Sequence, residues 1–456
     1  MAHVISDLSK YIILACMAIY TLLCFLALPR EEDDERIGIY SGQIVCMFLV
    51  HFLGFAAICL ETGDITYIIF YGFQQILLFA TIALYRVIYP QVNKLVVNNM
   101  CMLLTIGFVI LTRISYARAV KQFKIVTISL IVGLFIPYLV GKLKFLKHLT
   151  WVYGLAGVLA LSVVAVLGAT TYGAKISYSI LGYTFQPSEF VKIIFVFFVA
   201  GMLAESKDFG HIVLSAVAAA VHVLILVLSK DLGSALIFFA VYLVMVFVAT
   251  KNYFYLFAGS GAGAVAAFVA YQLFSHVRIR VTAWLDPWNN INDSGYQITQ
   301  SLFAIGTGGW FGMGLYQGDP SSIPFVEQDS VFSAIAEELG VVFALCLILV
   351  CLSCFVMFMT IAMRIREDFY KYIAVGLSTM YIFQVFLTIG GGTRFIPLTG
   401  VTLPLISYGG SSVLSTIMMF CIIQGLYLIK YREGNENDRK KRKRQTESEE
   451  IEEAEA

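Results

Sequence analysis

Charged residues are scarce in this sequence. Asp, Glu, Lys and Arg make up only 13% of its 456 residues, whereas a soluble domain carries about 25%. This scarcity excludes an ordinary soluble protein, and the formal net charge of +1 gives no support for a nucleic-acid partner. Because 59% of the residues are hydrophobic and the mean hydropathy is strongly positive, the composition predicts an all-α polytopic membrane protein.

Sequence patterns typical of metal sites are also lacking. The nine cysteines are scattered through apolar runs, and the C-x-x-C pair Cys351 and Cys354 has neither a second pair nor a nearby histidine. We interpret these cysteines as small apolar core residues rather than as a zinc or redox site. The N-terminus lacks the basic start and the cleavage site of a signal peptide, so we expect a retained first span.

Windows of about 20 apolar residues predict about thirteen membrane-spanning helices. The window at 189–204 is the shortest and contains Glu189 and Lys192, so it is the weakest of the set. The windows lie near residues 10–29, 38–60, 65–86, 97–112, 124–141, 150–168, 189–204, 211–228, 232–250, 254–274, 332–361, 371–390 and 412–430.

Basic residues in short loops predict the orientation of the chain in the membrane. They place the C-terminus in the cytoplasm and, with thirteen spans, the N-terminus outside. The loop at 113–124 disagrees, because it puts Arg113, Arg118, Lys121 and Lys124 on the external side. Residues 433–456, basic and then acidic, are expected to form a disordered charged cytoplasmic tail.

Four segments rich in Gly, Pro, Ser and Asn then fall outside, and we expect the functional surface there. They are residues 170–189, 229–234, 275–330 and 390–412. Within the third segment, glycines at 306, 308, 309, 312 and 314 are too dense for an ordinary spanning helix. This density predicts a re-entrant or surface-lying segment.

Several ionisable residues lie in or beside these segments. Glu189 and Lys192 share one helix face, where they either form an ion pair or line a cavity for an anionic headgroup. Asp231 is placed to cap the helix that follows it, and Arg278 and Arg280 would face one direction in an extended chain. Cations suit a phosphate-bearing substrate, and a nearby carboxylate suits a general base or a metal ligand. These residues alone indicate a membrane enzyme or a transporter for an anionic lipid-linked substrate.

Five segments resemble motifs of the SEDS family (shape, elongation, division and sporulation), to which RodA, FtsW and SpoVE belong. The resemblance runs in order over about residues 95–430 and implies a ten-helix glycosyltransferase core at 96–432. Residues 1–95, with about three spans, look like an additional N-terminal transmembrane module. The segments are FQPSEFVK (185–192), DLGSAL (231–236), GYQITQSLFAIGTGGWFGMGL (295–315), FSAIAEELG (332–340) and PLTGVTLPLISYGGSS (397–412).

The resemblance also implies an activity. SEDS enzymes join the disaccharide units of lipid II into glycan strands at the outer face of the bacterial cytoplasmic membrane, during elongation, division or sporulation. The implied partner is a class B penicillin-binding protein, and the implied cofactor is a divalent cation, Mg or Mn. Glu189 and Asp231 are candidates for supporting or metal-binding roles, and the metal ligands are otherwise unassigned. Two alternatives stay open: a lipid II transporter or flippase, and a non-catalytic scaffold for the penicillin-binding protein.

The resemblance assigns roles to individual residues. An essential aspartate is expected in the external loop WLDPWNNINDSGYQITQ (284–300), with Asp286 as the first catalytic candidate and Asp293 as the second. Asn290 stands where many members carry an aspartate, and Phe325 and Thr388 also depart from the family pattern. The implied substrate-binding residues are Glu189, Lys192, Lys230, Asp231, Arg280, Gln300, Asp329, Ser407 and Ser411.

Overall fold

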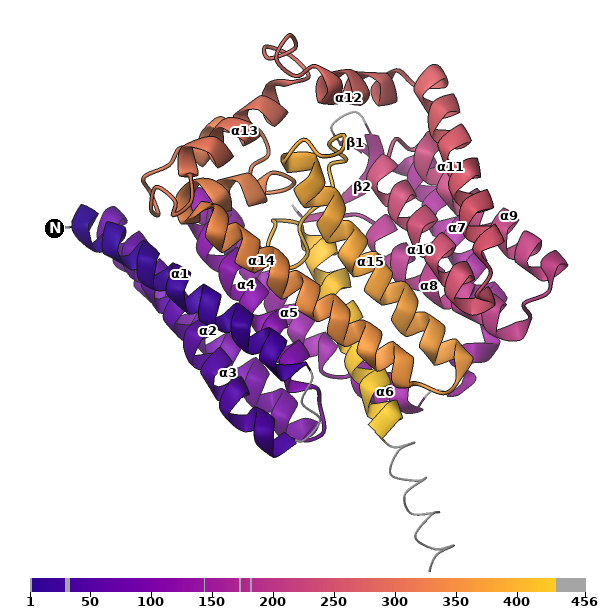
Figure 1. Cartoon of the computed structure of the whole chain (residues 1–456), viewed down its shortest axis with the longest axis horizontal. Helices are drawn as coiled ribbons and strands as arrows, with labels where there is room; N and C mark the ends of the chain where they lie inside the picture. Colours follow the sequence, from indigo (N-terminus) through magenta and orange to yellow (C-terminus); the bar gives the residue numbers. More distant parts are fainter. Residues whose placement is uncertain (1, 29–32, 143, 172–173, 181–182, 432–456) are drawn as a thin grey trace, which may run out of the picture.

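The computed structural model describes residues 2–28, 33–142, 144–171, 174–180 and 183–431, and the fold is a bundle of long helices (Figure 1). The predicted tail at 433–456 lies outside the described residues. The helices are α1 (Ala2–Ala27), α2 (Asp33–Thr62), α3 (Ile65–Ile88), α4 (Lys94–Ile114), α5 (Tyr116–Gly133), α6 (Ile136–Lys142), α7 (Thr150–Leu167), α8 (Ser188–Glu205), α9 (Phe209–Leu228), α10 (Leu232–Thr250), α11 (Tyr253–Leu273), α12 (Ser275–Leu285), α13 (Tyr296–Gly308), α14 (Val331–Arg364), α15 (Asp368–Gly392) and a last helix over Gly410–Tyr431.

Within the described residues, twelve helices are long and apolar enough to cross a membrane, and α5 and α6 together count as one of them. The thirteenth predicted span is also a helix, α8, whose 18 residues include Glu189, Lys192 and Glu205. Apolar stretches become helices in lipid because a helix satisfies its own backbone hydrogen bonds. Three of the twelve spans precede α4, and the other nine together with α8 supply the ten helices expected of the core. The predicted all-α polytopic membrane fold is confirmed.

The centre of the bundle consists of α4, α8, α15 and the last helix. Every residue of α4 between its first and last turn is buried, and α8 and α15 are buried along most of their length. Figure 1 shows α1, α2 and α3 on one side of this centre and α7, α9, α10 and α11 on the other. α11 has no buried residue and packs mainly against α10 and α12.

Buried polar side chains join the N-terminal helices to the core. Tyr20 of α1 donates to Asn99 Oδ1 of α4 at 2.9 Å, and Asn99 Nδ2 donates to Ser353 Oγ of α14 at 2.9 Å. Gln43 of α2 accepts from Asn98 Nδ2 of α4 at 2.9 Å. In lipid, helices associate through close packing and hydrogen bonds rather than through the hydrophobic effect. These bonds therefore fix α1 and α2 in one position against α4 and α14.

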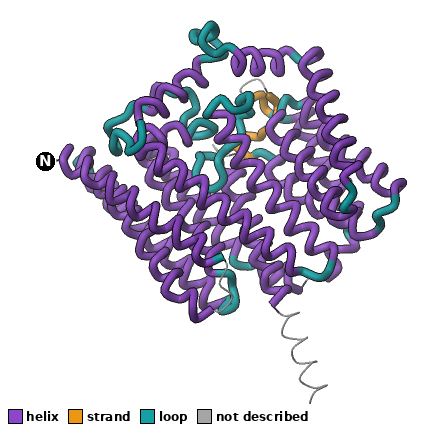
Figure 2. The backbone as a smooth tube through the Cα atoms, viewed as in Figure 1, coloured by secondary structure: helices purple, strands orange, loops and turns teal. Residues whose placement is uncertain are grey.

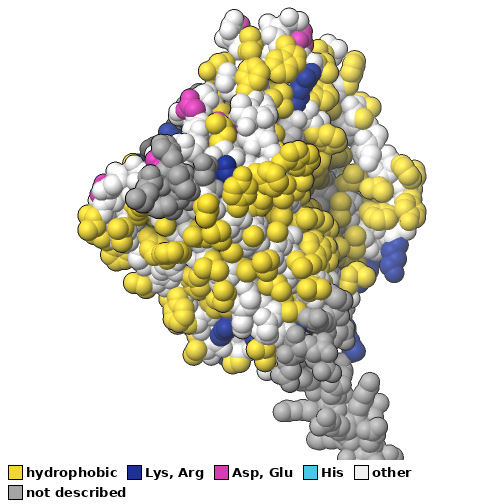
Figure 3. Space-filling view, turned by 60° about the vertical axis from the view of Figure 1, so that its left-hand side comes forward, with side chains coloured by type: hydrophobic (Ala, Val, Ile, Leu, Met, Phe, Trp, Pro, Cys, Tyr) yellow, Lys and Arg dark blue, Asp and Glu magenta, His cyan; other side chains and the backbone are white. Residues whose placement is uncertain are grey.

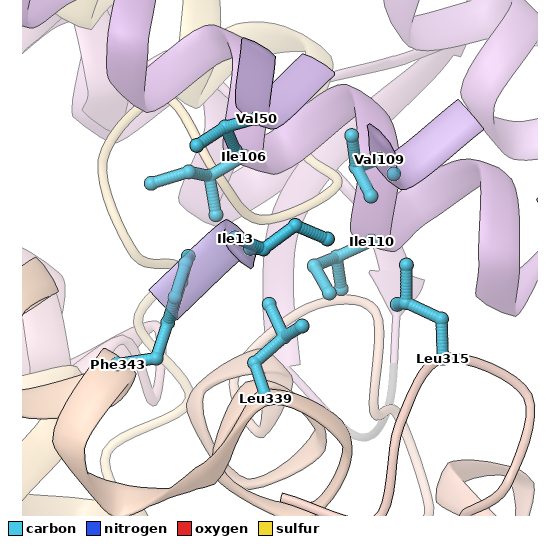
Figure 4. A pocket seen from close by; sticks show the side chains of 9 residues that line it. Ile13, Val50, Ile106, Val109, Ile110, Leu315, Leu339 and Phe343 are labelled. Atoms are coloured by element: carbon cyan, nitrogen blue, oxygen red, sulfur yellow. The ribbon is translucent and has the colours of Figure 1, made fainter. Parts of the chain in front are cut away.

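The apolar part of this junction is closely packed. Figure 4 shows side chains from α1, α2, α4, α14 and the loop before α14 around a cavity of about 10 Å³. A cavity of that volume holds at most about one water molecule, and apolar walls keep it dry. At Gly54 of α2, a Cβ atom would come within 2.8 Å of Val109 Cγ1, so the helices meet closely. Hydrophobic side chains dominate the surface on this side of the molecule (Figure 3).

A break in α14 organises the end of the bundle that carries α13. Gly340 has a φ of 90° and a ψ of 163°, which interrupts the helix and leaves backbone groups without helical partners. The segment after α13 satisfies them: Met313 N–H donates to the Glu337 carbonyl at 2.9 Å. The next amide, Gly314 N–H, donates to the Glu338 carbonyl at 2.8 Å. The segment around Gly312 therefore bonds the carbonyls that the break leaves free at Glu337 and Glu338.

Glycine is required where the two segments touch. A Cβ atom on Gly340 would lie 2.5 Å from Gly312 N, and one on Gly312 would lie 2.3 Å from the Glu338 carbonyl oxygen. Gly312 and Gly340 also have positive φ, which side chains disfavour. The glycine-rich stretch at 306–314 thus forms the end of short α13 and a loop. The prediction that it does not form a spanning helix is confirmed.

Three short antiparallel strands lie at the same end of the bundle (Figure 2). They are β1 (Ala169–Thr171), β2 (Ala174–Ile180) and β3 (Tyr183–Phe185), in the order β1-β2-β3. Thr171 pairs with Ala174, and Ile180 pairs with Tyr183. The sequence predicts only an external polar segment here, because strands this short give little periodic signal.

Candidate active site

A cavity of about 640 Å³ lies where α8, α10, α12, α13 and the loop after α15 meet. Cavities of this size hold drug-sized ligands or substrate headgroups. Its wall combines positive and negative side chains with hydroxyls and backbone from the loop at 398–412. The charged residues on the wall are Arg118, Glu189, Lys230, Asp231, Arg280 and Asp329.

The first turn of α8 supplies Glu189 to this wall, with Lys192 one turn deeper. Lys192 Nζ lies 2.8 Å from Glu189 Oε2 and donates to Gln384 Oε1 at 2.9 Å. Ser415 Oγ donates to Glu189 Oε2 at 3.1 Å. The ion pair forms, as the first interpretation expects, and Glu189 also lines the cavity, whereas the binding of an anionic headgroup stays a prediction. Lys192 is buried and is not among the residues that line the cavity, and its predicted substrate contact stays a prediction.

The turn between α9 and α10 places Lys230 and Asp231 on the wall. Asp231 Oδ1 accepts from Ser234 N–H at 3.1 Å, so the predicted cap of α10 is confirmed. Oδ2 accepts from Ser188 Oγ at 3.0 Å and from Gln186 Nε2 at 3.3 Å, which joins the turn to the start of α8. Lys230 has a left-handed φ of 65°, and hydrogen bonds from its own amide and the next to the last turn of α9 hold that conformation.

Residues 275–285 form helix α12, so the expectation that Arg278 and Arg280 would share a direction in an extended chain is wrong. Residues two apart on a helix point to different sides. Arg280 lines the cavity, and its Nη1 donates to the Thr399 carbonyl at 3.1 Å. Arg278 is exposed, and its Nη2 donates to the Gln272 carbonyl at 2.9 Å. Of these two arginines, only Arg280 can meet a ligand in the cavity.

Asp329, just before α14, is the most deeply buried aspartate on the wall. Its Oδ1 accepts from Gln297 Nε2 of α13 at 2.8 Å. Burial raises the pKa of Asp329 to about 6, although the Gln297 hydrogen bond and the Arg280 charge favour the ionised form. Burial in turn lowers the pKa of Arg280, against the charges of Asp231 and Asp329. A carboxyl with a pKa near neutrality suits proton transfer.

Arg113 and Arg118, which contradict the orientation rule, each pair with a glutamate at this end of the bundle. Arg113 Nε lies 2.8 Å from Glu338 Oε1, and its guanidinium lies 4.1 Å from the centre of the Tyr316 ring. Arg118 Nη1 forms an ion pair with Glu327 and also lines the cavity. These partners give a structural reason for the two arginines. Sequence reasoning missed Arg118 as a cavity residue, although its unexpected position was a signal.

The two catalytic candidates, Asp286 and Asp293, are not among the residues that line the cavity. Asp286 follows the last turn of α12, and its Oδ2 accepts from Asn289 Nδ2 at 2.6 Å. Asn290 donates to the Asp286 carbonyl at 2.7 Å and braces the loop. Asp293 is exposed in the turn before α13. The catalytic roles of Asp286 and Asp293 stay predictions.

The remaining predicted contacts divide between wall and support. Ser411 lines the cavity, and its Oγ accepts from Gln186 N–H at 2.9 Å. Ser407 is buried beside it, and its Oγ accepts at 2.9 Å from the backbone amide four residues earlier, which shapes the turn. Gln300 is not on the wall, whereas Gln297, one helical turn earlier in the same motif, is. A sequence pattern alone does not separate two glutamines one turn apart.

The oxygen donors fit a cation that arrives with a ligand. Among the described residues, no group of three or more His, Cys, Asp or Glu side chains could hold a metal ion alone. Magnesium usually binds one or two carboxylates together with substrate phosphates. Asp231, beside Lys230 in sequence and close enough to Arg280 to affect its pKa, is a carboxylate suited to that arrangement.

Comparison with known proteins identifies relatives. The peptidoglycan glycosyltransferase RodA of Mycobacterium tuberculosis is 37% identical over 292 residues, which are 60% of this chain and 62% of RodA. Stage V sporulation protein E of Bacillus subtilis is 32% identical over 272 residues, covering 58% of this chain and 74% of that protein. This chain therefore spans less than two thirds of the length of the RodA relative.

Solved structures show the same fold. A chain from a peptidoglycan synthase complex, described as coordinating polymerization and crosslinking, superimposes with a TM-score of 0.65 at 26% identity and covers 75% of this chain and 98% of that chain. RodA of Thermus thermophilus superimposes with a TM-score of 0.57 at 24% identity, with the same coverage. Residues 93–430 match the model of the family described as Cell cycle protein, which groups FtsW, RodA and SpoVE. Because that match contains all five sequence motifs and most of the chain, this protein is a member of the FtsW/RodA/SpoVE family, the SEDS family that the sequence motifs indicate.

Proposed function

We propose that this protein is a glycosyltransferase that polymerises lipid II into glycan strands. The observation that carries the proposal is the cavity, where the buried carboxyl of Asp329 lies close to the cation Arg280 and on the same wall as Lys230. In the reaction, a sugar hydroxyl of one lipid II attacks the anomeric carbon of another, and the diphosphate leaves. The hydroxyl needs a base, and the diphosphate needs cations. The names of the RodA relatives support the same activity.

Asp329 is the general base in this proposal. With a pKa of about 6 it is mostly ionised at pH 7 and still basic enough to accept a proton. The acceptor hydroxyl loses its proton to Asp329 while its oxygen attacks the anomeric carbon of the donor. Gln297 orients the carboxylate through its hydrogen bond. Asp231 accepts three hydrogen bonds from the protein, which suits it to positioning rather than to proton transfer.

The leaving group is a diphosphate, and Arg280 and Lys230 face it. As the bond between the anomeric carbon and the diphosphate oxygen breaks, negative charge grows on that oxygen, and fixed cations stabilise it. A divalent cation, Mg or Mn, bound through Asp231 and the phosphates would add Lewis-acid stabilisation. Glu189 and Lys192 keep the wall behind these groups rigid, because their buried pair is bonded on both sides.

We further infer that the end of the bundle with α12 and α13 is external. The loops and helix ends at the opposite end carry basic residues such as Lys251, Arg366 and Lys371, as expected of the cytoplasmic side. The C-terminus would then be cytoplasmic and the N-terminus external, in the bacterial cytoplasmic membrane. The similar chain from a synthase complex that couples polymerization to crosslinking supports a class B penicillin-binding protein as the partner.

Purified protein, with its penicillin-binding partner, Mg or Mn and labelled lipid II, tests the proposal. The wild type should form glycan strands on a gel, and Asp329→Asn should form none while still binding lipid II. Asp208→Asn is the matched control, because Asp208 is exposed at the start of α9 and outside the cavity wall. Equal polymerisation by Asp329→Asn would exclude Asp329 as the base.

A non-catalytic scaffold is the second candidate function, and two observations favour it. Asn290 occupies a family aspartate position, and Asp286 lies off the cavity wall. A scaffold should tolerate Asp329→Asn and Asp286→Asn without any change in cell-wall synthesis or complex formation. An enzyme should keep the complex and lose synthesis with one of them. A transporter has less support, since the cavity draws its polar residues from elements at one end of the bundle.

A further inference from the structure

Helix α12 carries a histidine on the same face as Arg280. His276 and Arg280 are four residues apart, and Ala283, three residues further on, lines the cavity together with Arg280. Residues at this spacing lie above one another on a helix. His276 therefore lies on the cavity side of α12, one turn beyond Arg280, at the rim. Its ring contacts that of Phe274, with 5.5 Å between the centres.

Two permanent cations act on this histidine. Arg280 lies on the same helix as His276, and Lys230 belongs to the α9–α10 turn. The negative charges of Asp231 and Asp329, from other elements of the cavity wall, act on Arg280. Burial, followed by the charges of Arg280 and Lys230, lowers the pKa of His276 below its ordinary value. The free protein therefore keeps the imidazole neutral at pH 7.

The Nε2 atom of His276 is buried and has no hydrogen-bond partner among the described residues. Buried polar atoms are nearly always bonded in folded proteins, so an unbonded one on the cavity side of α12 needs an explanation, although His276 itself is not among the residues that line the cavity. A ligand atom supplies one. Since the charges of Arg280 and Lys230 both act on this ring, the ligand atom that suits it belongs to an anion.

We infer that His276 is a proton-dependent third member of the group that binds the substrate diphosphate, with Arg280 and Lys230. This inference rests on the proposed function. When the diphosphate enters, its negative charges reverse the field at the imidazole, which takes up a proton from solvent. Nε2–H then donates to a phosphate oxygen. The proton returns to solvent when the diphosphate leaves, and no covalent bond forms or breaks in this step.

Linkage fixes the pH dependence of this binding. Because the complex holds one more proton than the free protein, diphosphate affinity falls as the pH rises between the free and the bound pKa of His276. The fall is up to about tenfold per pH unit in that range. Release of the diphosphate product is favoured in the same direction. The imidazole thus helps to bind the donor and, by losing its proton, to let the product go.

Proton uptake on binding tests the inference without turnover. The full chain in nanodiscs is titrated with undecaprenyl diphosphate by calorimetry at pH 7, in two buffers of different ionisation enthalpy. Wild type should take up close to one proton more than His276→Gln, and the titration of the diphosphate itself cancels between them. His211→Gln is the matched control, because His211 lies on α9 and its Nε2 bonds to the Met202 carbonyl. It should match wild type.

A second variant guards against a folding defect in His276→Gln. His276→Lys keeps a permanent charge and should bind the diphosphate at all pH values with about the wild-type affinity at low pH. Equal proton uptake by wild type and His276→Gln would overturn the inference and leave the proposed function standing. A wild-type chain that does not bind undecaprenyl diphosphate at any pH would contradict both.

Discussion

Asp329→Asn should stabilise the ligand-free protein while abolishing polymerisation. A buried carboxylate that is kept for chemistry costs folding free energy, and an amide of the same shape removes that cost. Asparagine can still accept the hydrogen bond from Gln297 Nε2 through its side-chain oxygen. The two readouts should therefore move in opposite directions, which a purely structural residue would not do.

The magnitude follows from the pKa of Asp329. Burial raises it from 3.8 to about 6, and about two pKa units correspond to roughly 3 kcal/mol. The favourable charge of Arg280 is already contained in this pKa, and the buried amide of the variant keeps a desolvation cost of its own, which offsets part of the gain. We expect a net stabilisation of about 1–2 kcal/mol at pH 7. Polymerisation should fall by about 10²-fold or more, as for the loss of a general base.

The difference in stability between wild type and Asp329→Asn should depend on pH. As the pH rises from about 4 to about 6, Asp329 ionises in the unfolded chain before it ionises in the folded protein, so wild type loses stability relative to the variant. The difference in the free energy of unfolding between the two proteins should be absent below about pH 4 and constant above about pH 7. Thermal unfolding of both proteins in detergent over this range measures it, with Asp208→Asn as the exposed control. A variant less stable than wild type at pH 7, or a difference independent of pH, would refute the reasoning.

Three further changes test the support around the site. Lys192→Met should lower the free energy of unfolding by about 3–5 kcal/mol, because Glu189 is left buried without its cation. The double variant with Glu189→Gln should regain most of that stability in thermal unfolding, and additive losses from the two substitutions would contradict the ion pair. Gly340→Ala should lower the melting temperature by several degrees and expose residues 309–314 to hydrogen exchange, whereas Gly306→Ala, which has open space around it, should not. Asn99→Leu removes the bond from Tyr20 of α1 to α4 and the bond from α4 to Ser353 of α14, worth about 0.6–2 kcal/mol each. Amides of α1 should therefore exchange faster, and unchanged exchange would show that apolar packing alone holds the N-terminal helices.

Charge inside a hydrophobic sequence was the most informative local signal. Glu189 and Lys192 have few options at membrane depth, so a shared helix face and an ion pair could be predicted from their spacing alone. Asp231 before an apolar run predicts a helix cap for a similar reason. Cys351 and Cys354 are buried in the core, as their apolar neighbours indicate.

Features set by contacts between distant segments could not be predicted. The direction of Arg278 and Arg280 depends on whether α12 is helical, and its 11 residues give no clear periodic pattern. The pairing of Arg118 with Glu327 joins residues from different elements. Asp286 lies off the cavity wall, whereas Asp329, which the motifs name as a substrate contact, lies on it and is bonded to Gln297 of α13. Such arrangements belong to tertiary structure and leave little trace in a local window.

Lipid II polymerisation by the purified protein is the most direct test of the central claim. The assay contains the penicillin-binding partner and Mg or Mn, and it reports both bound lipid II and glycan strand length. The cavity chemistry predicts strands from wild type and none from Asp329→Asn. Wild-type protein that binds lipid II in the complete mixture and forms no strands would contradict the claim that this cavity is an active site.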